Sequence, residues 1–317
     1  MSQSLIGIRY LSAEQIAELI ASGQHYKQEI LAGTEFNVKP QKVVGLLFFE
    51  NSTRTRVSFE QAAHYLGYRV SNFAASASSL SKGETLKDTI LTLKGERLDG
   101  IVIRHKASGS PALAARIFGG PVLNAGDGEH EHPTQALGDA VTILEHKPSL
   151  EGLKVAIVGD VLHSRVARSN AWLLSKMGAE IRFVGPKMLM PAHMAMMPGK
   201  VYNELLPGIH GADVVMTLRL QKERMADGLL SSIGEYRKLY QVNKETLKYA
   251  APDALVMHPG PINRGVELDD YAADGPQSVI GEQVENGIFV RMAALNWVFS
   301  DPKSKAGKST NKAGANA

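Results

Sequence analysis

A row of four polar residues, Ser52, Thr53, Arg54 and Thr55, separates an apolar run from a helix-like stretch in the segment FFENSTRTRVSFE. Hydroxyl groups and a guanidinium at a helix start suit an anion, because the first N–H groups of a helix lack partners and its dipole favours negative charge. Arg54 adds a planar fork that matches a phosphate. Capping by Ser52 would be a simpler explanation, but a cap requires only one such residue. We therefore expect a phosphate site, and not a P-loop, because the spaced Gly and Gly-Lys-Ser/Thr residues are missing.

A second group of donors follows the next apolar runs. Arg104 ends GIVIRH, and His132, Thr134 and Gln135 begin the helical segment of EHEHPTQALGD. A single strand-end arginine or helix-start histidine is more often structural. Together, however, an arginine and a histidine aimed at one carbonyl oxygen could stabilise the oxyanion of an acyl-transfer reaction.

Cationic residues also follow strands in the second half of the chain. The turn GDVLHSRVARSN has only Gly159 where a dinucleotide-binding turn needs three spaced glycines, and it supplies Arg165 and Arg168 instead. The segment MTLRLQKER adds Arg219, Gln221 and Arg224. Each of these residues alone could be an ordinary surface charge, but two such strand ends favour a dicarboxylate or a similar anion.

Two further loops could contact a ligand. In MHPGPINRG, Pro259 and Pro261 have no N–H, so the loop around Gly260 offers carbonyl oxygens that could accept hydrogen bonds from an amide NH2, unless it is only a rigid turn. The small-residue loop SSLSKGET carries Lys82, which could close on an anionic substrate or simply be solvated.

The elements that position these residues alternate between strand and helix in two series. A capped helix begins after Ser12, with Gln15 completing the box, and ends at Gly23. The expected strands lie at 42–49, 68–73, 100–105, 121–125, 154–160, 180–185, 212–219 and 253–260. The expected helices lie at 53–66, 85–95, 110–118, 133–145, 168–178 and 286–299. This pattern predicts an α/β protein with two doubly wound parallel-sheet domains and a boundary near 147–152.

Composition narrows the functional classes. The chain has no cysteine, which excludes disulfides and thiolate sites and favours a reducing compartment. No apolar run reaches membrane-span length and no leader pattern begins the chain, so we expect a cytoplasmic protein that binds no membrane. The segment 301–317 carries four Lys and one Asp, equal to the chain's whole net charge of +3, and its composition predicts disorder. A neutral body without a located basic face argues against nucleic-acid binding.

These motifs, in this order, resemble the aspartate carbamoyltransferase family. The resemblance rests on FFENSTRTRVSFE, SSLSKGETLKDT, IVIRH, HPTQALGD, GDVLHSRVARS, MTLRLQKER and HPGPINRG, and it covers about Leu5 to Ser300. STRTR and HPTQ are typical of carbamoyltransferases in general, whereas SKGET, LRLQKER and HPGPINRG indicate aspartate as the acceptor. The loop containing Lys82 is one residue shorter than in some members, so either Ser78 or Ser79 could match the family's loop serine.

The resemblance implies a role for each site residue. Carbamoyl phosphate would be bound by Ser52, Thr53, Arg54, Thr55, Arg104, His132, Gln135, Gly260 and Pro261. L-Aspartate would be bound by Lys82, Arg165, Arg219 and Gln221. The residues closest to the chemistry would be Arg54, Thr55, Lys82, Arg104 and His132, with His132 as a donor and no enzyme general base. Glu50 would form an interdomain salt bridge with Arg165 and Arg224.

The resemblance also implies the reaction and the assembly. The products would be N-carbamoyl-L-aspartate and phosphate, an early step of pyrimidine synthesis, with no cofactor and no metal. Residues 1–147 would bind carbamoyl phosphate, completed by a C-terminal helix at about 285–300, and residues 148–284 would bind aspartate. The chains would form a homotrimer with shared active sites, in which Lys82 enters the neighbouring site. A regulatory chain or a dihydroorotase are further partners that the sequence leaves open.

Three alternatives remain at this point. The acceptor could be ornithine or another amino acid, although ornithine enzymes typically carry a Cys-Leu-Pro motif in place of HPGP, and this chain has no cysteine. The chain could be a non-catalytic homologue that acts as a scaffold, but such a protein would be expected to lose some of the charged site residues. A general anion-binding module would bind without turnover, and a product assay would distinguish it from an enzyme.

Overall fold

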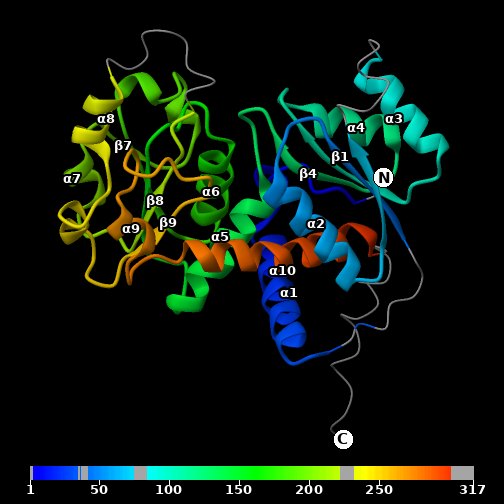
Figure 1. Cartoon of the computed structure of the whole chain (residues 1–317), viewed down its shortest axis with the longest axis horizontal. Helices are drawn as coiled ribbons and strands as arrows, with labels where there is room; N and C mark the ends of the chain where they lie inside the picture. Colours follow the sequence, from blue (N-terminus) through cyan, green and yellow to red (C-terminus); the bar gives the residue numbers. More distant parts are fainter. Residues whose placement is uncertain (1–2, 35, 37–41, 75–83, 222–231, 301–317) are drawn as a thin grey trace, which may run out of the picture.

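Two parallel β-sheets lie side by side in the computed structural model, which describes residues 3–34, 36, 42–74, 84–221 and 232–300 (Figure 1). The first sheet has the order β2-β1-β3-β4, with strands β1 (Val43–Phe48), β2 (Arg69–Ala74), β3 (Gly100–His105) and β4 (Val122–Asp127). The second has the order β7-β6-β5-β8-β9, with strands β5 (Lys154–Val158), β6 (Glu180–Val184), β7 (Lys200–Tyr202), β8 (Val214–Thr217) and β9 (Leu255–Met257). All strand pairs within both sheets are parallel, so the predicted fold class is confirmed.

Helices cover these sheets and connect their strands. In the first half they are α1 (Ala13–Leu31), α2 (Thr53–Tyr65), α3 (Leu86–Gly95), α4 (Ser110–Phe118) and α5 (Pro133–His146). In the second half they are α6 (Arg165–Lys176), α7 (Leu205–Ile209), α8 (Ile233–Tyr240), α9 (Asp270–Asp274) and α10 (Ile280–Phe299). None of the described helices is long and apolar enough to cross a membrane.

The first helix differs from its predicted extent. Its start is as expected, because the Ser12 side chain accepts the Gln15 N–H and Gln15 accepts the Ser12 N–H, which completes the capping box. The predicted end at Gly23 is wrong, since α1 continues to Leu31. Gly23 is buried where α10 crosses α1, and a Cβ there would lie 3.0 Å from a methyl of Val290. The glycine therefore permits close helix packing and does not end the helix.

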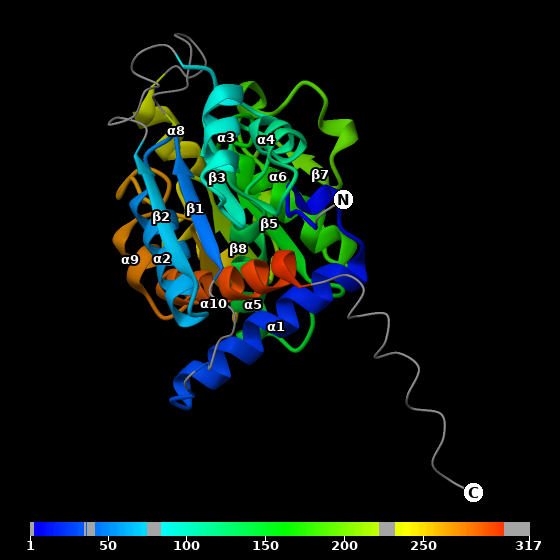
Figure 2. The same ribbon diagram turned by 90° about the vertical axis from the view of Figure 1, so that its right-hand side faces the viewer.

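The last helix returns to the first half of the chain. α10 begins at Ile280, earlier than predicted, and packs on α1, α5 and α2 beneath the first sheet (Figures 1 and 2). Its long run of buried residues reflects contact on several sides. The sequence prediction also missed β7, α7, α8 and α9, which are short elements of three to eight residues.

Each sheet contains one switch point, a pair of adjacent parallel strands from which the chain connections lead towards opposite edges of the sheet. In the first sheet this switch point lies between β1 and β3, and in the second between β5 and β8. Ligands of open α/β sheets bind at the carboxyl ends of such strand pairs. The row from Ser52 to Thr55 follows β1, Arg104 lies near the end of β3, Arg165 follows β5, and Arg219 follows β8. The two topologies thus bring the predicted residues to the two switch points.

Candidate active site

The polar row after β1 forms the start of α2. Ser52 occupies the N-cap position but makes no side-chain cap hydrogen bond to the helix backbone. Its hydroxyl instead donates to Oγ1 of the buried Thr55 at 2.9 Å. The simple capping explanation for Ser52 is therefore wrong in this structure, and the two hydroxyls are arranged beside the first turn of the helix.

The loop after β9 meets this row from the second half of the chain. Gly260 has φ of +65°, and a Cβ added there would lie 2.8 Å from Cζ of Arg54. The Arg54 guanidinium thus packs directly against Gly260. A cavity of about 470 Å³ adjoins this contact, lined by Arg54, Pro259, Gly260 and Pro261 among others.

The chemistry of the loop's backbone agrees with the sequence interpretation. Pro259 and Pro261 have no N–H, and the Gly260 N–H donates to Nδ1 of His258 at 2.7 Å. The His258 ring is buried, and its Nε2 lies 3.2 Å from Oε1 of Glu267. These contacts leave carbonyl oxygens as the groups that the loop can present to a ligand.

Glu50 joins the two switch points. Nη2 of Arg104 lies 2.9 Å from Oε1 of Glu50, and Nη1 of Arg165 lies 3.0 Å from its Oε2. Both guanidinium groups flank Gly126, where a Cβ would lie 3.0 Å from Arg165 and 3.1 Å from Arg104. The expected contact between Glu50 and Arg165 is present, and Glu50 also contacts Arg104, which the sequence analysis did not anticipate. Arg224, the other expected partner of Glu50, lies outside the described residues.

His132 is buried at the start of α5. Its backbone N–H donates to Oγ of Ser169 at 2.8 Å, and its Nδ1 has no hydrogen-bond partner among the described residues. Burial, followed by the positive charges of Arg104, Arg291 and Arg165, lowers the pKa of His132 well below its usual value. The imidazole is therefore neutral at pH 7, as expected for a hydrogen-bond donor beside cationic groups.

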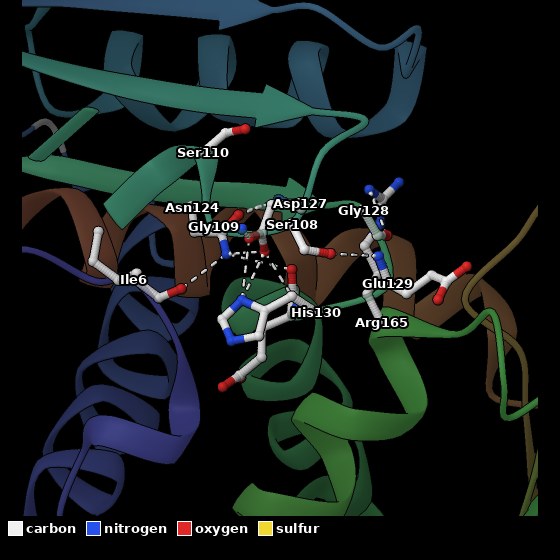
Figure 3. A network of polar contacts seen from close by, with 12 residues as sticks. Ile6, Ser108, Gly109, Ser110, Asn124, Asp127, Gly128, Glu129, His130 and Arg165 are labelled. Atoms are coloured by element: carbon white, nitrogen blue, oxygen red, sulfur yellow. Dashed lines mark hydrogen bonds and ion pairs between the residues drawn. The ribbon is translucent and has the colours of Figure 1, made fainter. Parts of the chain in front are cut away.

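A polar network shapes the loop that leads to His132 (Figure 3). The buried Asp127 accepts hydrogen bonds from the Gly109 N–H at 2.7 Å and from Nδ2 of Asn124 at 2.7 Å, and it lies 3.1 Å from Nδ1 of His130. The Gly128 carbonyl at the tip of this loop accepts from Arg165 at 3.3 Å. The network thus fixes the backbone that contacts Arg165 and precedes His132.

At the second switch point, one hydrogen bond joins the segment after β8 to the turn after β5. Nε2 of Gln221 donates to the His163 carbonyl at 2.9 Å, which joins the segment after β8 to the turn before α6. Arg219 is half-buried two residues before Gln221. Arg168 does not share the position of Arg165, because its guanidinium donates to the carbonyls of Glu129 and Leu162.

The structure shows contacts among several predicted site residues, namely Ser52 with Thr55, Arg54 with Gly260, and Arg104 and Arg165 through Glu50. Ser52, Thr53, Arg54, Thr55, Arg104, His132, Gln135, Arg165, Arg219, Gln221, Gly260 and Pro261 all follow or end strands at the two switch points or on the adjoining loops. Lys82, Ser78 and Ser79 lie outside the described residues. Among those that are described, no group of three or more His, Asp or Glu side chains could hold a metal ion.

Sequence reasoning missed the buried carboxylates that hold these side chains. Asp127 and Asp139 are fully buried and accept several hydrogen bonds each. The spacing of Gln135 and Asp139, four residues apart on a predicted helix, was the one available signal, because such pairs face each other.

Family profiles match nearly the whole chain. The aspartate/ornithine carbamoyltransferase carbamoyl-P binding domain matches residues 3–145, and the Asp/Orn binding domain of the same family matches residues 151–298. The chain belongs to the aspartate/ornithine carbamoyltransferase family.

Individual relatives and structures agree with this family. The chain is 51% identical to the aspartate carbamoyltransferase catalytic subunit of Moorella thermoacetica over 296 residues, covering 92% of this chain and 96% of the relative. Identity with the Brucella ovis catalytic subunit is 51% over 307 residues, with coverage of 96% and 94%. The structure of Trypanosoma cruzi aspartate transcarbamoylase in complex with N-(phosphonacetyl)-L-aspartic acid matches with a TM-score of 0.84 at 34% identity, with coverage of 93% and 95%. Ornithine carbamoyltransferase from Pyrococcus furiosus matches with a TM-score of 0.83 at 30% identity, with coverage of 93% and 96%.

Proposed function

We propose that this chain is an aspartate carbamoyltransferase, which transfers the carbamoyl group of carbamoyl phosphate to the α-amino group of L-aspartate. The observation that carries the proposal is the meeting of the two switch points. A phosphate-suited row and a neutral histidine in one half lie beside Arg165 of the other half, and Glu50 contacts arginines from both. An acyl phosphate and a dicarboxylate are the ligands that suit these two sets of donors.

Each group has a role in the proposed reaction. Ser52, Thr53, Arg54 and Thr55 bind the phosphate, while Thr55, Arg104 and His132 donate to the carbamoyl oxygen. Gln135 and the carbonyls of Gly260 and Pro261 accept hydrogen bonds from the carbamoyl NH2. Arg165, Arg219 and Gln221 bind the carboxylates of aspartate, and Lys82 completes the anion-binding site.

The chemical step requires no enzyme base. The aspartate nitrogen forms a bond to the carbonyl carbon, giving a tetrahedral oxyanion, and the bond from this carbon to the phosphate oxygen then breaks. The leaving phosphate takes the proton from the nitrogen, so the atoms and charges balance. His132 is neutral beside Arg104, and donors such as these stabilise the oxyanion where charge develops.

The choice of aspartate over ornithine rests on sequence similarity and charge, because structures of both kinds of enzyme have the same fold as this chain. Relatives at 51% identity are aspartate carbamoyltransferase catalytic subunits. Arg165 and Arg219 offer two cations at the acceptor side, which suits two carboxylates better than the cationic side chain of ornithine.

The deciding experiment supplies purified protein with carbamoyl phosphate and either aspartate or ornithine. We expect N-carbamoyl-L-aspartate from the first mixture and no citrulline from the second. Citrulline would show that the acceptor was wrongly assigned. An absence of product from both mixtures, together with measurable phosphate binding, would favour an anion-binding module or scaffold.

We also propose a homotrimer with shared active sites. Val57 is 44% exposed on α2, three residues after Arg54, so an apolar side chain is exposed next to the phosphate-binding row. Inactive R54A and K82A subunits can be mixed, dissociated and reassociated. Recovery of activity would support shared sites, whereas sites built from one chain alone would give none.

The proposed division of labour follows the two sheets. Residues 1–147 with the last helix would form the carbamoyl-phosphate unit, and residues 148–284 the aspartate unit. The packing of α10 on α1, α2 and α5 supports this grouping. Expression of each unit followed by phosphate titration would test it, with binding expected only in the first.

A further inference from the structure

A buried carboxylate on α5 lies directly behind the proposed site. Asp139 has no exposed surface and accepts three hydrogen bonds, all from side-chain amides. Its Oδ1 accepts from Nε2 of Gln135 at 2.8 Å and from Nε2 of Gln283 at 2.8 Å. Its Oδ2 accepts from Nδ2 of Asn170 at 2.7 Å. One carboxylate thus joins α5, α6 and α10.

The contact with Gln135 fixes which end of that amide faces the substrate. Both oxygens of Asp139 accept hydrogen bonds from amide NH2 groups, so the NH2 group of Gln135 is the end that faces Asp139. The opposite end of the amide is the Oε1 acceptor. A flipped Gln135 would present NH2 to the carbamoyl NH2 and leave two acceptors facing each other at Asp139, which is unfavourable in a buried site.

The contact with Gln283 reaches the carbonyl loop. Because the NH2 group of Gln283 donates to Asp139, its Oε1 points the other way and accepts the backbone N–H of His258 at 2.9 Å. Nδ1 of the His258 ring in turn accepts the Gly260 N–H at 2.7 Å. A continuous path of three hydrogen bonds therefore connects Asp139 to Gly260.

We propose that Asp139 is a positioning residue that orients both sets of acceptors for the carbamoyl NH2, the Oε1 of Gln135 and the carbonyls of the Gly260–Pro261 loop. This inference rests on the proposed carbamoyl transfer and concerns the same site. Asp139 does not touch the substrate. It acts through Gln135 on one side and through Gln283 and His258 on the other.

A neighbouring hydrogen bond provides a matched control. Thr142 lies three residues after Asp139 on α5, and its Oγ1 accepts from Nδ2 of Asn286 on α10 at 3.0 Å. This bond is buried in the same helix interface, but neither residue contacts Gln135, Gln283 or His258 through any described hydrogen bond. Thr142→Val removes the hydroxyl at similar shape, and Asn286 keeps its bond to Glu145.

The experiment measures kcat/KM for carbamoyl phosphate and the inhibition constant of inorganic phosphate in D139N, Q135A, D139N/Q135A and T142V. The D139N substitution places an NH2 group among three donors, so we expect kcat/KM to fall by about 10- to 100-fold. The phosphate inhibition constant should stay within about twofold, because the phosphate contacts lie elsewhere. In the Q135A background the D139N effect should be at least about fivefold smaller, since one of its two routes is already lost.

Each outcome bears on the inference. Equal D139N effects in both backgrounds, or equal losses of phosphate and carbamoyl phosphate binding, would overturn it in favour of a purely structural role. T142V should retain wild-type kinetics. A fall in its kcat/KM equal to that of D139N would also favour a purely structural role for Asp139. If D139N does not fold, as judged by circular dichroism, Q283M tests the second route and should lower kcat/KM while leaving phosphate inhibition unchanged. Wild-type protein that forms no N-carbamoyl-L-aspartate would instead refute the proposed function, and this inference with it.

Discussion

The part of the proposed site that would bind carbamoyl phosphate (the donor side) and the part that would bind aspartate (the acceptor side) are assembled in different ways. On the donor side, Thr55, Arg104 and His132 are buried, and they come from α2, β3 and the start of α5, all in the first half of the chain. On the acceptor side, Arg165 belongs to the second half, but the carboxylate that contacts it is Glu50, which follows β1 in the first half. The three groups expected to donate to the carbamoyl oxygen therefore come from one half, whereas Arg165 on the acceptor side is held by a carboxylate of the other half.

The difference also concerns charge. Arg104 and Arg165 have side chains that are 11% and 9% exposed, and they share a single carboxylate that is 22% exposed. A substrate anion that binds beside these two partly buried cations would add a second negative charge next to them. Glu50 contacts both cations and thus fixes their positions relative to each other.

The largest expected effect concerns the donor side alone. In H132A, kcat should fall about a hundredfold, because an oxyanion donor is lost, while KM for aspartate changes little. H146A is the matched control, since His146 is on the last turn of the same helix and, within the described part of the chain, its side chain is hydrogen-bonded to the exposed Glu282. Steady-state kinetics check this prediction, and a similar loss in both variants would contradict a donor role for His132.

A smaller effect is expected at the connection between the two sides. E50Q keeps the shape but removes the charge that contacts Arg104 and Arg165, so kcat/KM for aspartate should fall by about tenfold. The kcat/KM for carbamoyl phosphate should fall by a smaller factor than the kcat/KM for aspartate. E60Q provides a control, because Glu60 is on the same helix as the phosphate-binding row but accepts from Asn72 at 3.2 Å and, among the described residues, forms no ion pair with Arg104 or Arg165. Equal losses for the two substrates would show that the acceptor side does not depend specifically on this contact.

Ser52 distinguishes ligand binding from helix capping. Because its hydroxyl donates to Thr55 and does not cap α2, S52A should lower kcat/KM for carbamoyl phosphate by about fivefold. The free energy of unfolding should change by less than about 0.5 kcal/mol. S232A is the matched comparison, since Ser232 accepts the Glu235 N–H at 3.0 Å, and loss of such a cap costs about 1 kcal/mol. Denaturant unfolding of both variants would refute the prediction if S52A were the less stable one.

The smallest effect is a pH dependence of stability. Burial lowers the pKa of His132 in the folded state, so the unfolded state binds more protons, and stability falls as pH drops below the unfolded value near 6.5. At pH 5.5 the loss should be about 1 kcal/mol, or on the order of 2 °C in Tm. Melting curves at pH 7.5 and 5.5 should show a smaller Tm difference for H132Q than for wild type. An equal difference in both proteins would mean that His132 is not held neutral.

Local patterns predicted much of the fold. Apolar runs such as the one before Ser52 became central strands, and the Ser12 capping box began α1 as expected. Gly23 misled the prediction because its role depends on α10, more than 250 residues away in sequence, and no local pattern contains that contact. β7 was missed because it is a three-residue edge strand and its residues are not buried.

The site was predictable to the level of its ligand-facing residues, since cations and hydroxyls after strand ends carry a chemical signal. The residues behind them carried little, because the spacing of Gln135 and Asp139 was the one local signal among them. Asp127 and Asp139 have the same composition signal as any surface aspartate, and only tertiary packing reveals that each is buried among several donors. The capping role considered for Ser52 could be excluded only from the structure, because the spacing of residues in the sequence does not show which group a hydroxyl bonds to.

The return of α10 to the first half affects how the protein can be made. Helix α10, which packs on α1, α2 and α5, is synthesised after all the strands of both sheets. The apolar surfaces of these three helices therefore stay uncovered by α10 until the second half has been synthesised. Such contacts between distant segments slow folding, because the entropy cost of closing a long loop comes before the packing contacts that offset it. A nascent chain that stops before Ile280 would leave this part of its core exposed to chaperones and proteases.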